Sequence, residues 1–242
     1  LVPCDVYAPS EISMEGIKLN SDGEYPLERV QERFNQVKHA VVGSIVPHFY
    51  QLNPRLRPTV IFAPGVPESR WIAEHLSKPH SVNGLKYDPI PTAHIDADTT
   101  EAERTEIFRL FEAGEIVAIS NFGILQEGWD APFAEHAILC RPMAAVTTYV
   151  QIVGRILRAS PGKRRATLQD HVGAWWRPGL GSPNQDRFWS LSDTNRSISS
   201  EEKKARSDPD KVEPARCPKC TRPLSDRMST SEGFKCVCGH VF

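Results

Sequence analysis

The chain has 242 residues, of which 40% are hydrophobic and 24% charged, a composition that suits one or two folded domains and excludes a wholly disordered chain. Its 29 basic and 30 acidic residues give a net charge of −1, so overall charge provides no argument for a nucleic-acid or membrane partner. The sequence lacks the run of about 18 apolar residues that a membrane span requires. Residues 1–5 lack the basic start of a signal peptide, and with no membrane span we expect no membrane partner. The sequence also lacks an initiator Met, so we expect a piece of a longer chain.

Residues 1–24 contain recurring Pro and Gly, which predicts an irregular leading segment. Apolar residues then recur three or four positions apart between Pro26 and Gln51, which predicts a long amphipathic helix. Short apolar strands and further helices are predicted downstream in alternation. The strands cover residues 59–63, 92–95, 116–120, 136–140 and 166–170, and the helices cover 68–76, 100–111 and 144–158. The helix at residues 100–111 is expected to begin with a capping box of Thr100 and Glu103.

Strands that alternate with helices at this spacing predict βαβ crossovers and a parallel sheet covered on both faces. We expect residues 25–175 to form this α/β domain, with binding and catalytic groups on loops at the carboxyl ends of the strands. We expect residues 176–214 to form an extension and linker, because residues 190–214 have few apolar side chains and begin with a Ser-rich stretch at residues 190–200. Four clustered cysteines follow within residues 215–242.

A phosphate-binding loop of the form G-x-x-x-x-G-K-[ST] is missing from the sequence. The nearest candidate, at residues 160–163, has Gly162 and Lys163 but neither the upstream Gly nor the following Ser or Thr. We therefore expect that this chain alone neither binds ATP tightly nor hydrolyses it.

Two segments carry the strongest functional signal. The first, NFGILQEGWDAP, runs from Asn121 to Pro132, and the second, QIVGRILR, runs from Gln151 to Arg158. Within the second segment, offsets of four and three place Gln151, Arg155 and Arg158 on one face of the predicted helix. A glutamine and two guanidinium groups on one face favour an anionic partner with several oxygens, such as a triphosphate.

These segments resemble motifs V and VI of the second RecA-like lobe of superfamily-two helicases and translocases, the DEAD/DEAH-like group. Residues 59–63 resemble motif IV, and residues 96–111 resemble the segment that commonly joins the motifs. The resemblance covers about residues 55–172. It implies a RecA-like helicase C-terminal lobe, an ATP and Mg²⁺ site held mainly by a first lobe outside this chain, and nucleic acid as a partner.

The resemblance also implies which residues form the site. The implied nucleotide contacts are Gln151, Arg155, Arg158, Gly128 and Asp130. The implied nucleic-acid contacts are Asn121, Gly123, Phe62 and Arg141. Arg155 and Arg158 would act as arginine fingers on the γ-phosphoryl group, and Gln151 would contact phosphate or the attacking water. Asp130 has the alternative role of a turn cap, and Arg141 has that of covering a sheet edge.

The C-terminal cysteines form two close pairs, Cys217 with Cys220 and Cys236 with Cys238, and His240 follows them. Close pairs without a secretory signal favour a metal over disulfides, and a reducing, cytoplasmic compartment. Four thiolates at this spacing resemble a zinc ribbon, in which Zn²⁺ takes the place of an apolar core. Because the second pair is one residue tighter than usual, three interpretations stay open: four cysteine ligands, a set that includes His240, or no metal.

The sequence therefore predicts the C-terminal lobe of an ATP-dependent DNA helicase or translocase, joined to a small zinc ribbon. RNA is the alternative to DNA. Two further functions stay open, a non-catalytic nucleic-acid-binding module and the motor subunit of a restriction or repair complex.

Overall fold

The computed structural model describes residues 1–10, 12–123, 132–177, 180–184, 215–223, 229–230 and 233–241. Its helices are α1 (Leu27–Leu52), α2 (Val66–Leu76), α3 (Glu101–Glu112) and α4 (Val146–Ile156). The strands of its central sheet are β1 (Cys4–Tyr7), β2 (Thr59–Phe62), β5 (Thr92–Ile95), β6 (Ala118–Asn121), β7 (His136–Leu139) and β8 (Ala166–Asp170). Two short hairpins are formed by β3 (His80–Val82) with β4 (Leu85–Tyr87), and by β9 (Ser229–Thr230) with β10 (Gly233–Phe234).

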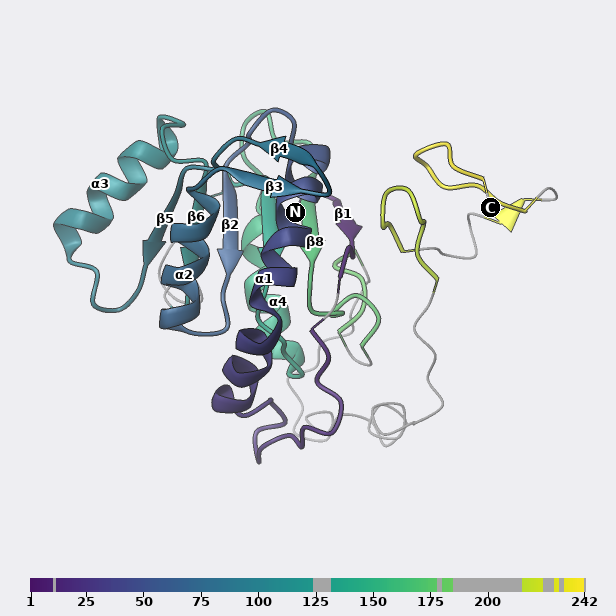
Figure 1. Ribbon diagram of the computed structural model, residues 1–242, viewed down its shortest axis with the longest axis horizontal. Helices are drawn as coiled ribbons and strands as arrows, with labels where there is room; N and C mark the ends of the chain where they lie inside the picture. The colour runs from purple at the N-terminus through teal and green to yellow at the C-terminus, as the bar shows by residue number, and fades with distance from the viewer. Residues whose placement is uncertain are drawn as a thin grey trace.

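The central sheet has the strand order β1-β8-β7-β2-β6-β5, and every neighbouring pair runs parallel. Strands β2, β6, β7 and β8 are buried along their whole length, as expected of parallel strands covered on both faces. In Figure 1, α1 and α2 lie together in front of the sheet, and α3 lies beyond its β5 edge. The prediction of an α/β fold with a parallel sheet is confirmed.

Helix α1 lays an apolar stripe against the sheet, which includes the fully buried Phe34, Ile45 and Phe49. Helix α3 begins with the predicted capping box: Glu103 N–H donates to the Thr100 hydroxyl, and the Glu103 carboxylate accepts from Thr100 N–H. Within the described residues, every helix is too short or too polar to cross a bilayer.

The first 24 residues are not irregular throughout, because Cys4–Tyr7 forms the edge strand β1. This strand pairs with β8 in a register that sets Cys4 opposite Ala166 and Tyr7 opposite Gln169. The α/β domain consequently begins well before residue 25, the start that we predicted. A four-residue strand gives little periodicity, and its partner lies about 160 residues away, so local pattern alone did not reveal it.

Candidate functional site

The carboxyl ends of the parallel strands meet along one edge of the sheet, where sites of α/β proteins commonly lie. The implied nucleic-acid contacts lie along this edge, but two of them turn inward. Phe62 is the last residue of β2 and its side chain is buried, and Asn121, the last residue of β6, donates its amide to the Ile61 carbonyl oxygen at 2.8 Å. These two side chains support the sheet from within.

Gly123 and Arg141 lie closer to the surface of the same edge. Gly123 follows β6 with a φ of 82°, a backbone conformation that favours glycine. Arg141 follows β7, and its guanidinium stands 5.3 Å from the centroid of the Phe122 ring, so a cation–π contact joins the ends of β6 and β7. Burial lowers the pKa of Arg141, and the negative charge of Glu24 partly offsets that effect.

Gln151 and Arg155 both lie on α4, one turn apart, with Gln151 exposed and Arg155 half-buried. The opposite side of the helix is fully buried through Ile152, Val153 and Ile156. The helix ends at Ile156, two residues earlier than predicted, so Arg158 lies exposed in the turn that follows rather than on the helix face. Its backbone N–H still bonds the Arg155 carbonyl oxygen at 3.3 Å, which keeps the two arginines adjacent.

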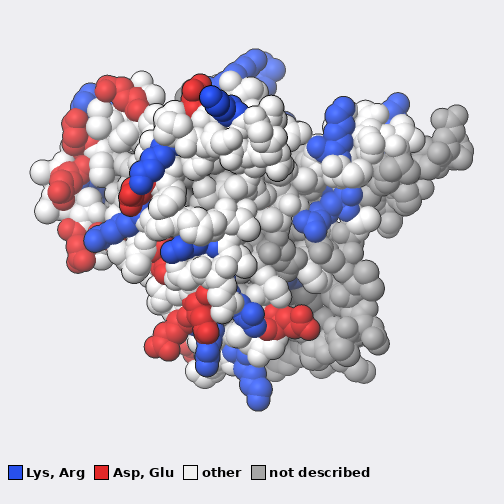
Figure 2. All heavy atoms as spheres, in the orientation of Figure 1, with Lys and Arg blue, Asp and Glu red and all other residues white. Residues whose placement is uncertain are grey.

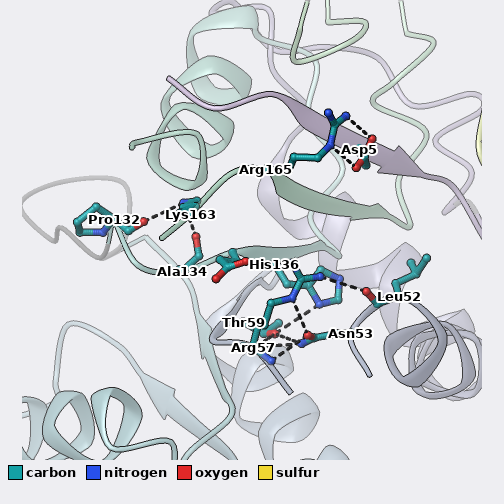
Figure 3. A network of polar contacts seen from close by, with 11 residues as sticks. Asp5, Leu52, Asn53, Arg57, Thr59, Pro132, Ala134, His136, Lys163 and Arg165 are labelled. Atoms are coloured by element: carbon teal, nitrogen blue, oxygen red, sulfur yellow. Dashed lines mark hydrogen bonds and ion pairs between the residues drawn. The ribbon is translucent and has the colours of Figure 1, made fainter. Parts of the chain in front are cut away.

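The remaining implied nucleotide contacts, Gly128 and Asp130, lie outside the described residues. The segment that precedes β7 is nevertheless anchored by a contact that the sequence did not suggest. Lys163 is buried, and its ammonium donates to the carbonyl oxygens of Pro132, at 2.9 Å, and Ala134, at 2.5 Å (Figure 3). Lys163 therefore ties the end of the motif V segment to the loop that follows Arg158.

A second polar group that the sequence did not reveal lies between α2 and β5. Ser69 Oγ lies 2.7 Å from His94 Nδ1, and His94 Nε2 donates to Asp96 at 2.9 Å. Burial opposes ionisation of Asp96, but hydrogen bonds from His94 and Arg70 outweigh it and hold the pKa of this carboxyl well below its usual range. Because Ser69 is fully buried, this relay cannot attack a substrate and serves to fix Asp96.

Asp96 lines an open cavity of about 680 Å³ at the carboxyl end of β5, together with residues of the α3 N-terminal half. Its charged lining residues are Arg70, Asp96, Asp98, Glu103 and Glu106. The excess of carboxylates makes this cavity a poor place for a phosphate group. It does not overlap the implied nucleotide contacts on α4.

The four clustered cysteines converge on one point, with all four sulfur atoms within 4.8 Å of one another. Cys217 Sγ lies 3.7 Å from Cys238 Sγ, and Cys220 Sγ lies 3.5 Å from Cys236 Sγ. Tetrahedral Zn²⁺ with bonds of about 2.3 Å to sulfur sets its ligand atoms about 3.8 Å apart, so the thiols fit that ion. They are too far apart for disulfides, whose sulfur atoms lie about 2.05 Å apart.

His240 supports this cluster through its backbone, and among the described residues the converging ligand atoms are those of the four cysteines. Its carbonyl oxygen accepts from Cys236 N–H at 2.8 Å. A backbone hydrogen bond from His240 is also the main reason why the pKa of Cys238 falls to about 7, which favours its thiolate. Of the three interpretations that the sequence left open, the geometry favours four cysteine ligands.

The described part of this cysteine module is basic. Its charged side chains are Arg216, Lys219, Arg222 and Lys235, and it has no Asp or Glu. In the view of Figure 2, the module at the right accordingly shows blue side chains without red ones. Four thiolates around Zn²⁺ would carry a net charge of about −2, which nearby cations offset.

Comparisons with known proteins agree with this description. The helicase conserved C-terminal domain family matches residues 46–160. A "51.5 kDa protein" of a Lactococcus phage (isolate 7-9) is 23% identical over 244 residues, which is 100% of this chain and 48% of that protein. "Putative ATP-dependent helicase IRC3" of Saccharomyces cerevisiae is 33% identical over 100 residues, which is 41% of this chain and 14% of that protein. The chain spans less than half the length of both relatives.

Among solved structures, a fragment described as a "putative HsdR subunit of a type I restriction enzyme" from Vibrio vulnificus YJ016 has a TM-score of 0.51 to this chain. The two are 19% identical, and the similarity covers 71% of this chain and 32% of that one, so it shows a shared fold. The sheet topology and the match over residues 46–160 lead to one assignment: the chain contains a helicase conserved C-terminal domain with a RecA-like fold, followed by a module with four clustered cysteines.

Proposed function

We propose that this lobe works in an ATP-dependent DNA helicase or translocase, where it completes an ATP site whose phosphate-binding loop belongs to a first lobe. The observation that carries the proposal is the arrangement of Gln151, Arg155 and Arg158. Gln151 is exposed and Arg155 half-buried on α4, and the exposed Arg158 follows the end of the helix, where its N–H donates to the Arg155 carbonyl oxygen. A first lobe docked there would bring its bound triphosphate within reach of both guanidinium groups.

In this arrangement each side chain has a distinct task. Arg155 and Arg158 stabilise the charge that develops on the γ-phosphoryl group, an effect worth about 10³–10⁵ in rate in P-loop enzymes. Gln151 contacts a phosphate oxygen or positions the attacking water. The Mg²⁺ that accompanies ATP is held by the first lobe and neutralises phosphate charge when bound. Gly128 and Asp130 are proposed to complete the nucleotide contacts from the motif V segment.

Nucleic acid is proposed to cross the carboxyl edge of the sheet. The burial of Phe62 and Asn121 favours contact through the backbone near Gly123 and through Arg141, rather than through all four implied residues. Such contacts reach phosphates and carry little sequence preference. Closure of the lobes on ATP and reopening after hydrolysis would then move the strand.

The cysteine module is proposed to hold one structural Zn²⁺ through Cys217, Cys220, Cys236 and Cys238, with no open position for catalysis. Its basic side chains suit contact with the phosphates of the same nucleic acid. Removing residues 210–242 should then weaken DNA binding and reduce its salt dependence. Unchanged affinity and salt dependence would assign the module a purely structural role.

The direct test compares Arg158→Ala with Arg164→Ala in the intact protein. Arg164 is an exposed arginine six residues downstream, so it controls for loss of surface charge. We expect Arg158→Ala to lower DNA-stimulated ATP hydrolysis by about 10³-fold while DNA binding persists, and Arg164→Ala to leave both unchanged. Equal activity of the two variants would remove the basis for the arginine-finger role.

The same preparation separates the alternative functions. An intact protein that binds DNA without hydrolysing ATP would be a non-catalytic binding module. One that hydrolyses ATP and displaces a triplex strand, without separating a duplex, would be a translocase of the kind that restriction or repair complexes use.

A further inference from the structure

The outer edge of the central sheet is covered by segments from the far end of the chain. An exposed edge strand presents unpaired N–H and C=O groups, which proteins usually cover. On β1, the Asn184 side chain pairs with both backbone groups of Cys4, accepting and donating at 2.8 Å. Directly after β1, Ala8 N–H donates to the Thr221 carbonyl oxygen at 3.0 Å, and Arg216 donates to the Ala8 carbonyl oxygen.

A charged network strengthens the same contact. Asp5 in β1 accepts two hydrogen bonds from Arg165 of the neighbouring strand region, at 2.7 and 2.8 Å (Figure 3). Arg222 of the cysteine module lies 2.7 Å from the same carboxylate and donates to the Tyr7 hydroxyl at 3.1 Å. Its guanidinium also stands 5.1 Å from the centroid of the Tyr7 ring. Because the Asp5 and Arg222 side chains are only 20% exposed, water screens this pair less than a surface ion pair.

The contacting residues belong to the turn that carries the first cysteine pair, here called the knuckle, residues 216–222. Cys217 N–H donates to the Arg222 carbonyl oxygen at 2.9 Å, and Thr221 N–H donates to the Cys217 carbonyl oxygen at 2.8 Å. Thr221 itself has a φ of 60°, a strained conformation for a β-branched residue. Tyr7 packs against the buried Cys217, Cys220 and Cys236.

We propose that metal binding by the four cysteines and coverage of the β1 edge are coupled, so that the bound ion holds the knuckle in the shape that docks onto the helicase lobe. This rests on the proposed Zn²⁺ site but not on the proposed ATP chemistry. Two metal–sulfur bonds fix the turn between Cys217 and Cys220, and that turn presents the Thr221 carbonyl oxygen and the Arg222 side chain to β1. The cysteine module is then an attached part of the lobe.

Amide hydrogen exchange of the full chain, measured by mass spectrometry, tests the coupling. The protein is compared with Zn²⁺ bound and after removal of Zn²⁺ by a chelator in the presence of a thiol reductant, while elemental analysis follows the metal content. We expect exchange in peptides covering residues 2–9 to rise by about tenfold on chelation, as local opening becomes easier. Peptides covering β5, at the opposite edge of the sheet, serve as the control and should not change.

A second comparison separates docking from metal binding. Arg222→Ala should keep one Zn²⁺ per chain yet raise exchange at residues 2–9, whereas Arg164→Ala should change neither. Equal protection of β1 before and after Zn²⁺ leaves would overturn the coupling while the metal site stands. A purified protein that binds no Zn²⁺ and still protects β1 would overturn both the metal site and the coupling, and neither result bears on the ATP site.

Discussion

Replacing Lys163 by Met tests whether the loop after Arg158 and the segment before β7 are held together by one ammonium group. The side chain is 7% exposed and donates to two backbone carbonyl oxygens, at 2.9 and 2.5 Å. Hydrogen bonds to a charged group contribute about 1.5–3 kcal/mol each, and the cost of burying the charge offsets part of that gain. Met restores packing but removes the donor from the buried carbonyl group of Ala134 and from the half-buried one of Pro132. We therefore expect Lys163→Met to lower the free energy of unfolding by about 2–3 kcal/mol.

Urea denaturation at pH 7, followed by tryptophan fluorescence, measures this loss. Arg164→Ala removes a neighbouring but exposed cation and should change the free energy of unfolding by less than about 0.5 kcal/mol. If Lys163→Met were as stable as the original protein, the two hydrogen bonds would not anchor the segment before β7. The inferred link between that segment and the loop after Arg158 would then be wrong.

The pH dependence of the same comparison gives a second, independent readout. Burial lowers the pKa of Lys163 to about 8, and the negative charge of Glu135 opposes this effect only in part. Between this value and the ordinary lysine pKa of 10.5, the unfolded chain binds more protons than the folded one, so stability rises with pH. The advantage of the original protein over Lys163→Met should therefore widen from pH 8 to 10, and a gap that narrows would contradict the burial of the charged form.

Three further changes follow from the described contacts. A Cβ at Gly65 would lie 2.1 Å from Gln31 Nε2 and 2.3 Å from a Glu68 carboxylate oxygen, so Gly65→Ala should displace the ends of these two side chains and break the 3.0 Å hydrogen bond between them. The expected cost is about 1 kcal/mol in thermal unfolding, unlike an alanine at an open site. Thr100→Ala removes the helix cap and should cost about 1 kcal/mol; no loss of stability would mean that the capping box is dispensable. Asp96→Asn should destabilise the protein at pH 7. Since the folded pKa of Asp96 is depressed, this difference should be full above about pH 4 and shrink as the pH falls further, and a constant difference would refute the hydrogen-bonded carboxylate.

The sequence predicted the central strands because burial on both faces leaves a continuous apolar run, as in β2 and β7. It missed the β3–β4 hairpin, although Asn83-Gly84 is a strong signal for a tight turn and both residues have positive φ. The flanking strands have only three residues each, too few for a periodic pattern. The sequence also predicted that α4 ends at Arg158, two residues after its actual end at Ile156. The first helix-breaking signal in the sequence is Ser160-Pro161, which lies beyond that end.

For the candidate site, cysteine spacing predicted the cluster, but only the fold could rank Cys238 above His240 as a ligand. Lys163 followed Gly162 and resembled a fragment of a phosphate-binding loop, whereas its ammonium is used internally. The relay from Ser69 to His94 depends on α2 packing against β5, a contact between segments that sequence spacing does not relate. Polar groups that support a site through long-range contacts therefore escape pattern analysis.

The pairing of β1 with β8 has a consequence for how the molecule assembles. Asp5 and Arg165 are 160 positions apart in the chain, so this pairing closes a long loop. Contacts of such separation are entropically costly and are reached after those nearer in sequence. During synthesis β1 is made before β8, so β1 stays unpaired until β8 has emerged. In that interval β1 is the strand most open to incorrect pairing with other strands or chains.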